Sequence, residues 1–269
     1  MAKKFAVLGS PIQHSKSPQI HLAAYRALGL DWDYERYEVT ESELAIFLKA
    51  TNFDGLSLTM PLKEIAYDLA VSDDEAARQS NTANTLLKSP TGWLGFNTDV
   101  FGLERALWAV PKSRALILGS GATARNAVLA LKATTGAGTI SVKARNHDKA
   151  NAVIEWAAGL GISVLPVDHA ADLSDFNLVL STLPPGSDTQ GWFVGTPSGT
   201  LLDVAYNPWP SVLATQWLNS GCNVISGIEM LIWQAIAQIR VFLNGSVAEP
   251  LENEDEIAEV MRAAAKAEG

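Results

Sequence analysis

Small residues with the spacing of a dinucleotide-binding loop stand in the middle of the chain. Residues 114–125 read RALILGSGATAR, so an apolar strand runs into Gly119-x-Gly121-x-x-Ala124 and then into a helical pattern. The first glycine allows a tight turn, the second lets the backbone approach a pyrophosphate, and the small third residue lets helix and strand pack closely. The helix N-terminus offers N–H groups and a positive dipole end to phosphates. An ordinary tight turn is the alternative, but the strand before the loop, the helix after it and a second strand expected at 140–144 favour a nucleotide site.

The loop after that second strand carries basic residues. In NAD-specific domains of this type an Asp or Glu about 20 residues past the glycine loop binds the ribose 2′-hydroxyl. Here the region reads Ala144-Arg145-Asn146, and a guanidinium can bind the 2′-phosphate of NADP through paired hydrogen bonds. Asp148 is acidic and nearby, but we expect it inside the next helical turn, where an acid suits the N-terminus. The loop therefore predicts NADP over NAD, with Arg145 the main discriminator and Lys149 secondary; a solvated loop arginine is the alternative.

A serine-rich cluster, His14-Ser15-Lys16-Ser17-Pro18, follows the first expected strand. Ser17 and Pro18 look like the N-cap and the first residue of a helix. That interpretation leaves Ser15 unexplained. Two hydroxyls beside a helix N-terminus are suited to holding a carboxylate.

Three more polar clusters lie at residues 59–63, 81–85 and 97–99. Lys63 falls in the first turn of a helix opened by Pro61, where a cation opposes the helix dipole. This placement weakens the interpretation of Lys63 as an ordinary surface lysine. Asp99 precedes an amphipathic helix and can simply be its N-cap.

The pattern along the chain alternates strands and helices. Strands are expected at 5–8, 34–39, 56–59, 115–118, 140–144, 163–167, 178–181, 201–204 and 224–225, helices at 18–28, 42–50, 62–70, 99–109, 227–243 and 253–267, and a β-hairpin around 89–92. Such alternation implies parallel sheets with helices on their faces. Because the glycine loop lies in mid-chain, two α/β domains fit better than one, with the boundary along the 99–110 helix.

Composition limits the classes of function. With 48% hydrophobic and 18% charged residues, the 269-residue chain can bury a core. A net charge of −9 argues against broad nucleic-acid binding, and the single cysteine gives no evidence of an oxidising compartment. Gly9-Ser10-Pro11 ends the first apolar run too early for a signal peptide, and no stretch approaches the ~20 apolar residues of a membrane span. We expect a cytoplasmic protein with no membrane partner, and the histidines show no metal-ligand spacing.

Together these blocks closely resemble the shikimate dehydrogenase family, in family order and from residue 5 to about 245. The matching segments are Gly9-Ser10-Pro11-Ile12-x-His14-Ser15-x-Ser17-Pro18, Leu58-Thr59-Met60-Pro61-x-Lys63, Ala83-Asn84-Thr85, Asn97-Thr98-Asp99, the glycine loop, Asp203-Val204-x-Tyr206-Asn207-Pro208 and Gly227-x-x-Met230-Leu231-x-x-Gln234. Seven ordered blocks are far more specific than any single motif.

The resemblance implies a substrate-binding domain at 1–103, an NADP-binding Rossmann-like domain at 104–226 and C-terminal helices at 227–269 that pack back on the first domain, with the active site in a cleft between the domains. It implies reversible, NADP-dependent interconversion of 3-dehydroshikimate and shikimate in the chorismate pathway to aromatic amino acids, without a metal. It also implies roles for individual residues. Lys63 and Asp99 match the catalytic pair; Ser15, Ser17 and Tyr206 match carboxylate binders; Thr59, Asn84 and Gln234 match binders of the ring hydroxyls; and Gly119, Ser120, Gly121, Ala122, Thr123, Ala124, Arg145, Lys149, Val204 and Gly227 match the cofactor site.

The residue chemistry agrees with these roles. Reducing a ketone needs a proton donor besides the hydride of the nicotinamide, and a lysine ammonium on the developing alkoxide can supply the proton. The family usually has asparagine where Ser57 and Leu22 stand, and Ala144 loses a polar contact of the family's cofactor loop. Two alternatives stay open: a quinate/shikimate enzyme with mixed NAD and NADP use, and a catalytically silent NADP-binding sensor. The sequence also leaves open a monomer or a homodimer.

Overall fold

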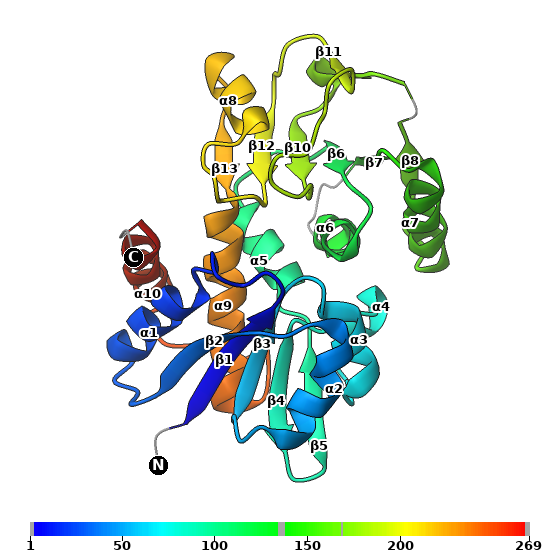
Figure 1. Ribbon diagram of the computed structural model, residues 1–269. Helices are drawn as coiled ribbons and strands as arrows, with labels where there is room; N and C mark the ends of the chain where they lie inside the picture. Colours follow the sequence, from blue (N-terminus) through cyan, green and yellow to red (C-terminus); the bar gives the residue numbers. More distant parts are fainter. Residues whose placement is uncertain (1–2, 134–137, 168, 267–269) are drawn as a thin grey trace. The chain divides into compact units, whose positions relative to one another are not determined.

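The computed structural model describes residues 3–133, 138–167 and 169–266 (Figure 1). The chain forms two compact units, a first one of Met1–Gly102 with Leu231–Gly269 and a second one of Leu103–Met230. It passes between them inside two helices, α5 (Asp99–Ala106) and α9 (Gly227–Asn244).

The first unit is built on a five-stranded mixed sheet in the order β2-β1-β3-β4-β5. Its strands are β1 (Lys4–Gly9), β2 (Asp33–Glu38), β3 (Gly55–Leu58), β4 (Thr85–Ser89) and β5 (Gly92–Phe96). β1 runs parallel to β2 and β3, whereas the hairpin β4-β5 is antiparallel. The expected hairpin is therefore confirmed, and it makes this sheet mixed rather than purely parallel.

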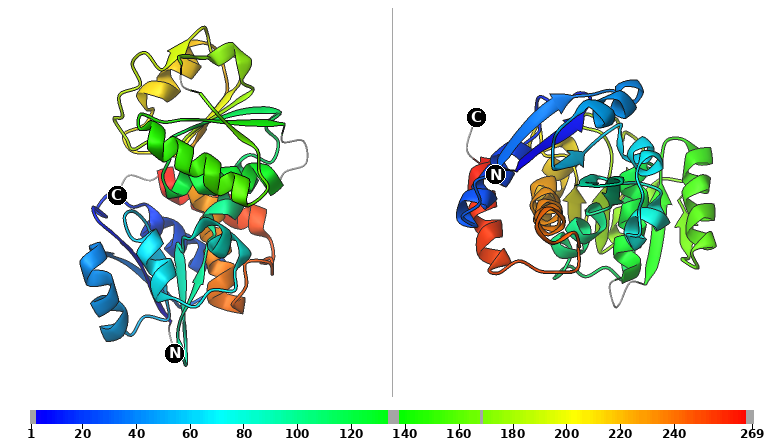
Figure 2. Two further views of the ribbon diagram at one scale, coloured as in Figure 1. Left: turned by 90° about the vertical axis from the view of Figure 1, so that its right-hand side faces the viewer. Right: turned by 90° about the horizontal axis from the view of Figure 1, so that it is seen from below.

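Helices cover both faces of this sheet: α1 (Ser17–Ala27), α2 (Glu41–Ala50), α3 (Lys63–Leu69), α4 (Glu75–Ser80), α9 and α10 (Glu254–Lys266). Side chains along β3 alternate between the two faces of the sheet, so the strand packs against helices on both sides. Leu56 and Leu58 join the hydrophobic cluster formed with α2 and α3. Gly55 faces α9, where a Cβ would lie 2.6 Å from the Phe242 ring, so only glycine lets this helix pack so close. α2 and α9 lie on opposite sides of the sheet in both Figure 1 and Figure 2.

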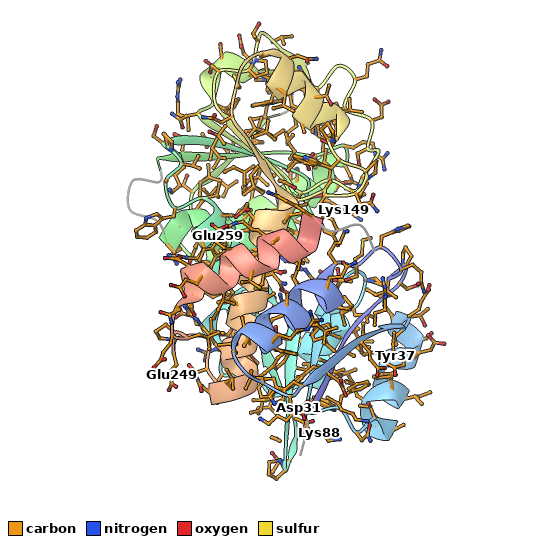
Figure 3. The ribbon with its side chains drawn as sticks, turned by 90° about the vertical axis from the view of Figure 1, so that its left-hand side faces the viewer. Asp31, Tyr37, Lys88, Lys149, Glu249 and Glu259 are labelled. Atoms are coloured by element: carbon orange, nitrogen blue, oxygen red, sulfur yellow. The ribbon has the colours of Figure 1, made fainter. Side chains whose placement is uncertain are left out.

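The C-terminal helix returns to the first unit, as expected. α10 packs along α1 through an apolar stripe that includes Ile257 and Met261, both buried (Figure 3). An ion pair joins the first residue of this helix to α9: Glu254 Oε2 lies 2.6 Å from Nη2 of the buried Arg240. The acids in the first turn of α10 suit the helix dipole.

The second unit is built on a six-stranded parallel sheet in the order β13-β12-β10-β6-β7-β8. The strands are β6 (Arg114–Leu118), β7 (Thr139–Lys143), β8 (Val164–Pro166), β10 (Leu178–Ser181), β12 (Thr200–Asp203) and β13 (Val224–Ser226). Read from β8, the order is 3-2-1-4-5-6, the doubly wound order of dinucleotide-binding sheets. The strand order reverses between β6 and β10, and ligands of such sheets bind at the carboxyl ends of the strands around that point.

The helices packed on this sheet include α6 (Ala122–Ala133), α7 (His147–Gly159) and α8 (Val212–Asn219). The two-residue strands β9 (Ala171–Asp172) and β11 (Phe193–Val194) pair beside it. The α8 face is closed by Leu213 and Trp217, which pack on Leu116, Leu118 and Val179. The α/β class with a Rossmann-like sheet is confirmed. No described helix is long and apolar enough to cross a membrane.

Candidate active site

Lys63 and Asp99 form an ion pair in the first unit. Each is the first residue of its helix, Lys63 of α3 and Asp99 of α5, and 2.6 Å separates Lys63 Nζ from Asp99 Oδ2. The Lys63 side chain is 16% exposed and the Asp99 side chain 5%, so both charged groups are largely shielded from water. The N-cap alternative for Asp99 does not hold, because this residue already lies inside α5 and its carboxylate accepts from Lys63.

Asn84 holds the other oxygen of that carboxylate. Its Nδ2 donates to Asp99 Oδ1 at 2.7 Å and to Thr98 Oγ1 at 3.0 Å, and Gln234 Oε1 lies 3.3 Å away. Asn84 Oδ1 accepts from the Thr98 backbone N–H at 2.8 Å. A backbone N–H can only donate, so this bond fixes which end of the amide faces Asp99. Four of the predicted site residues are thus joined: Lys63, Asn84, Asp99 and Gln234.

The loop before α5 is itself held by hydrogen bonds. Asn97 Oδ1 accepts from the Asp99 backbone N–H at 3.0 Å, and Asn97 Nδ2 donates to Ser80 Oγ at 2.8 Å and Thr82 Oγ1 at 3.0 Å. All of these groups are buried. A polar loop in the interior is stable only when such partners are supplied, and here they fix the position of the Asp99 backbone.

The serine cluster differs in one respect from the expectation. Ser17 is not the N-cap of α1: the cap position falls on Lys16, whose φ of −83° and ψ of −3° are already helical. The helix therefore starts one residue early, and Ser15 Oγ accepts from the Ser17 backbone N–H at 3.3 Å. Ser17 is 4% exposed, and Ser15 is half-buried. The two hydroxyls lie at the start of one helix in the first unit, and Thr59, also half-buried there, follows β3.

The predicted cofactor residues gather at the carboxyl edge of the second sheet. Gly119, Val204 and Gly227 follow the last residues of β6, β12 and β13 directly. Gly119 has a φ of +113°, and a Cβ there would meet Thr182 Oγ1 at 2.3 Å. A Cβ on Gly227 would lie 2.1 Å from Val204 O. Gly119 thus lies against the Thr182 hydroxyl and Gly227 against the Val204 backbone, each at a distance that only glycine permits.

Gly121 shows a different constraint. A Cβ at this position would meet nothing within 4 Å, and α6 begins at the next residue, Ala122. The packing of the protein therefore does not require glycine at 121. Open space before a helix N-terminus at the switch point fits a pyrophosphate.

The loop after β7 presents the predicted basic residues. Arg145 and Lys149 are exposed, whereas Lys143 is buried and donates to His169 O at 2.8 Å. Asn146 caps α7 by accepting from the Lys149 backbone N–H at 2.9 Å. Asp148 lies in the first turn of α7, as expected.

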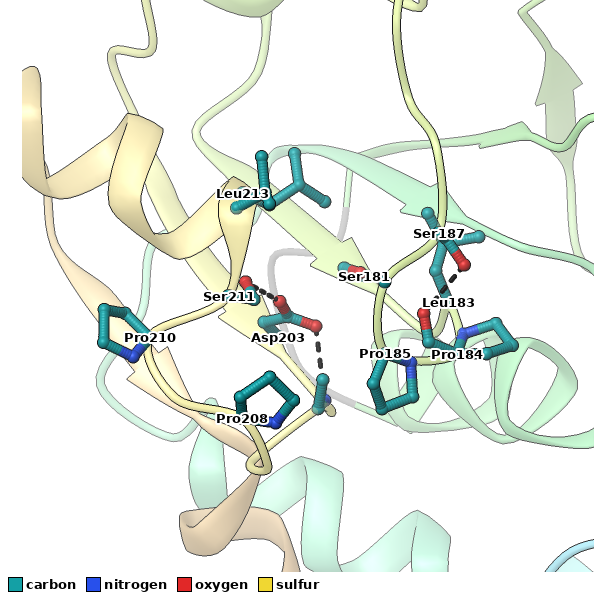
Figure 4. A pocket seen from close by; sticks show the side chains of 13 residues that line it. Ser181, Leu183, Pro184, Pro185, Ser187, Asp203, Pro208, Pro210, Ser211 and Leu213 are labelled. Atoms are coloured by element: carbon teal, nitrogen blue, oxygen red, sulfur yellow. Dashed lines mark hydrogen bonds between the residues drawn. The ribbon is translucent and has the colours of Figure 1, made fainter.

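Tyr206, the remaining predicted carboxylate binder, belongs to the second unit and follows β12. The segment around it borders a small cavity of about 140 Å³ at the ends of β10 and β12 (Figure 4). Asp203 in this cavity accepts from the Ser211 hydroxyl and from the Ala205 backbone N–H, and burial raises the pKa of its carboxyl group. Asp203 thus ties the segment that carries Tyr206 to the start of α8.

Gln238 was not predicted from the sequence as a site residue, although its amide nitrogen bonds to the Asn84 backbone carbonyl and to the Thr85 hydroxyl. A signal for it existed: Gln234 and Gln238 are four residues apart within a largely apolar stretch of α9, so they share one face. Across the described ranges, no group of three or more His, Cys, Asp or Glu residues is placed to hold a metal ion.

Comparisons with known proteins agree with this arrangement. Residues 7–86 match the model of the shikimate dehydrogenase substrate binding domain. A shikimate dehydrogenase (NADP(+)) of Aeropyrum pernix is 35% identical over 271 residues, 96% of this chain and 98% of that protein. The crystal structure of Mycobacterium tuberculosis shikimate dehydrogenase superposes with a TM-score of 0.84 at 39% identity, covering 98% of both chains. A Thermus thermophilus enzyme solved in complex with NADP(H) and shikimate gives a TM-score of 0.81 at 29% identity, over 97% of this chain and 99% of the other.

Proposed function

The chain belongs to the shikimate dehydrogenase family, and from this premise we propose that it catalyses the NADP-dependent, reversible reduction of 3-dehydroshikimate to shikimate. The observation that carries the proposal is the Lys63–Asp99 ion pair held by Asn84. A catalytically silent sensor has no need of an oriented acid, so the intact pair favours an enzyme.

In the proposed reaction Lys63 is the proton donor. As the ketone is reduced, the Lys63 ammonium group gives a proton to the oxygen that becomes the alcohol, and in the oxidation direction the neutral amine takes it back. Asp99 orients the ammonium group through its 2.6 Å contact and stabilises its charge. Asn84 Nδ2 binds the other carboxylate oxygen and so keeps Asp99 turned toward Lys63.

The substrate's other groups have proposed partners. Ser15, Ser17 and Tyr206 hold the carboxylate by neutral donors, while Thr59, Asn84 and Gln234 contact the ring hydroxyls. A polyol ring needs several such donors and acceptors. The buried or half-buried positions of the first-unit members suit them to binding away from bulk water.

NADP fits the second unit. We place its pyrophosphate at Gly119–Ala124 and its 2′-phosphate at Arg145 and Lys149, and we place its nicotinamide end near Val204 and Gly227. The open space at Gly121 and the exposed basic pair support this assignment. When bound, NADPH supplies the hydride for the reduction. We accordingly assign substrate binding to residues 1–103, cofactor binding to 104–226, and packing against the first domain to 227–269.

The test is a spectrophotometric assay of the purified protein with shikimate and quinate, each with NADP and with NAD. We expect shikimate with NADP to give the highest kcat/KM of the four pairs. A higher kcat/KM with quinate would make the protein a quinate enzyme. No turnover with any pair, in a protein that still binds NADPH, would support the sensor alternative.

A further inference from the structure

A series of hydrogen bonds leads from Tyr34 to Asn84, and each residue in it donates to the next one. Tyr34 Oη donates to Ser57 Oγ at 2.6 Å, and Ser57 Oγ donates to Gln238 Oε1 at 2.9 Å. Gln238 Nε2 donates to Asn84 O at 3.2 Å and to Thr85 Oγ1 at 3.1 Å. Thr85 Oγ1 then donates to Asn84 Oδ1 at 2.9 Å. All five residues are more than nine-tenths buried.

The direction of each bond is set by its neighbours. A carbonyl oxygen only accepts, so the bond to Asn84 O fixes the amide of Gln238 with its nitrogen toward β4 and its oxygen toward Ser57. The Thr85 hydroxyl accepts from that nitrogen, which leaves its single proton for Asn84 Oδ1. Gln238 thus holds Asn84 twice, directly at its backbone carbonyl and through Thr85 at its side chain.

The fold explains why this glutamine reaches the site. Ser57 occupies the α9-facing side of β3, like Gly55, whose missing side chain lets α9 pack close to the sheet. Gln234 and Gln238 are one turn apart on α9, and both reach Asn84. Gln234 meets the side-chain nitrogen of Asn84, whereas Gln238 binds its backbone carbonyl.

We propose that Gln238 is a positioning residue for the reaction: by fixing Asn84 and Thr85 it keeps Asp99 turned toward Lys63. This inference rests on the proposed function, since it assigns a role in turnover. In this proposal the substrate is contacted by Lys63, Asp99 and Asn84, and Gln238 acts only through these residues. Orientation of this kind matters because a shift of about 1 Å in a reacting group can cost on the order of 100-fold in rate.

The first variant, Gln238→Met, keeps the size of the side chain and removes its hydrogen bonds. We expect kcat for shikimate oxidation to fall roughly 10- to 100-fold, with KM for NADP unchanged. KM for shikimate should rise by a smaller factor, because Asn84 is also a proposed substrate ligand. Ile236→Val is the matched control: it is a fully buried change on the same helix, outside the polar series, and kcat should stay within twofold.

The second variant, Gln238→Glu, separates positioning from mere packing through its pH profile. A protonated glutamic acid keeps the donor toward Thr85 and the acceptor toward Ser57, whereas a carboxylate has no donor. The variant-to-wild-type ratio of kcat should therefore fall as pH rises from 6 to 9, because burial raises the pKa of such a carboxyl group. Among the described residues, the ionisable groups that face this position are His21, whose pKa burial lowers to about 4, and Tyr34, whose pKa burial raises. Neither titrates in that range.

Circular dichroism and thermal unfolding establish that each variant is folded, and rates are expressed per folded protein. A falling ratio, or one that stays at the level of the methionine variant, supports the proposal. Folded Met and Glu variants that both keep wild-type kcat across this range would overturn it. Failure of the proposed function is seen separately, because wild-type protein would then show no shikimate oxidation at all.

Discussion

At the scale of single residues, Lys63 stands where stability alone would not put it. A cation in the first residue of α3 opposes the helix dipole, which typically disfavours it by about 0.3–1 kcal/mol. The contact with the nearly buried Asp99 offsets this cost. The local pattern showed only the unfavourable placement. The partner, 36 residues away, was indicated by the resemblance to the family, which matches Lys63 and Asp99 to one pair.

The role of Lys63 can be tested by Lys63→Met. Removing a positioned acid or base usually costs roughly 10²–10⁴-fold, so we expect that loss in kcat for shikimate oxidation. The Kd for NADPH should barely change, because the proposed cofactor residues belong to the other unit. Lys49→Met, at an exposed lysine of α2, is the control and should keep full activity. Near-normal kcat in Lys63→Met would remove this residue from the mechanism.

Arg145 is the residue on which cofactor choice depends in our proposal. Its exposed side chain follows β7, where an acid would select NAD. Arg145→Ala should raise KM for NADP at least tenfold and leave KM for NAD almost unchanged, because charge-assisted bonds to a phosphate are worth about 1.5–3 kcal/mol each. Steady-state kinetics with both cofactors measure this.

The matched control for that variant is Arg114→Ala. Arg114 is an exposed arginine of the same unit, but it begins β6 and so lies at the amino end of the sheet. Its loss should leave both KM values unchanged. If wild-type protein uses NAD with equal or better kcat/KM than NADP, the interpretation of this loop is wrong.

At the scale of elements, periodic segments were predictable and short capped ones were not. The strands at 178–181 and 201–204 are apolar runs bounded by polar residues, and they lie within one residue of the prediction. α4 was missed because it has only 6 residues and no apolar period. α8 was missed too, although Ser211 caps it by accepting from the Ala214 N–H. Ser17 was misplaced by one residue because Lys16 already has helical angles.

The site was predictable in part for a similar reason. Residue types and motif order identified Lys63, Asn84, Asp99 and Gln234, which the structure joins by hydrogen bonds. Gln238 was not identified, because its partners come from β3 and β4, 153 to 181 residues away in sequence. Such long-range pairing depends on the packing of α9 on the sheet, which the local pattern does not specify.

The glycine loop gives a paired prediction at this scale. Gly119→Ala should destabilise the protein by on the order of 1–3 kcal/mol, since the backbone is left-handed and the new Cβ would strike Thr182. Gly121→Ala should leave the unfolding temperature unchanged, because the added Cβ meets open space, but it should raise the Kd for NADPH at least tenfold by filling the approach to the pyrophosphate. Thermal unfolding and a fluorescence titration with NADPH measure the two effects. Equal NADPH affinity in Gly121→Ala and wild type would place the pyrophosphate elsewhere.

At the scale of the whole molecule, one buried histidine couples stability to pH. His21 is fully buried, stacks on Tyr34 with 4.0 Å between ring centroids, and bonds through Nδ1 to Ser17 O. Burial lowers its pKa from 6.5 to about 4, so the ring is neutral in the folded protein near pH 7. The unfolded chain takes up a proton at 6.5, whereas the folded chain resists protonation until about 4.

Between these two values the unfolded state binds more protons, so stability falls as pH decreases. The contribution of His21 is complete above pH 6.5 and is lost progressively toward pH 4, by roughly 3 kcal/mol for a shift of this size.

His21→Phe keeps a ring against Tyr34 and removes the titration. We expect its free energy of unfolding, measured by urea denaturation at several pH values, to decline less steeply between pH 6.5 and 4 than that of the wild type. Tyr25→Phe is the control, because the buried Tyr25 hydroxyl has no hydrogen-bond partner among the residues that the structure describes and does not titrate there, so the wild-type slope should remain. Identical slopes for His21→Phe and the wild type would mean that acid sensitivity comes from the carboxylates alone.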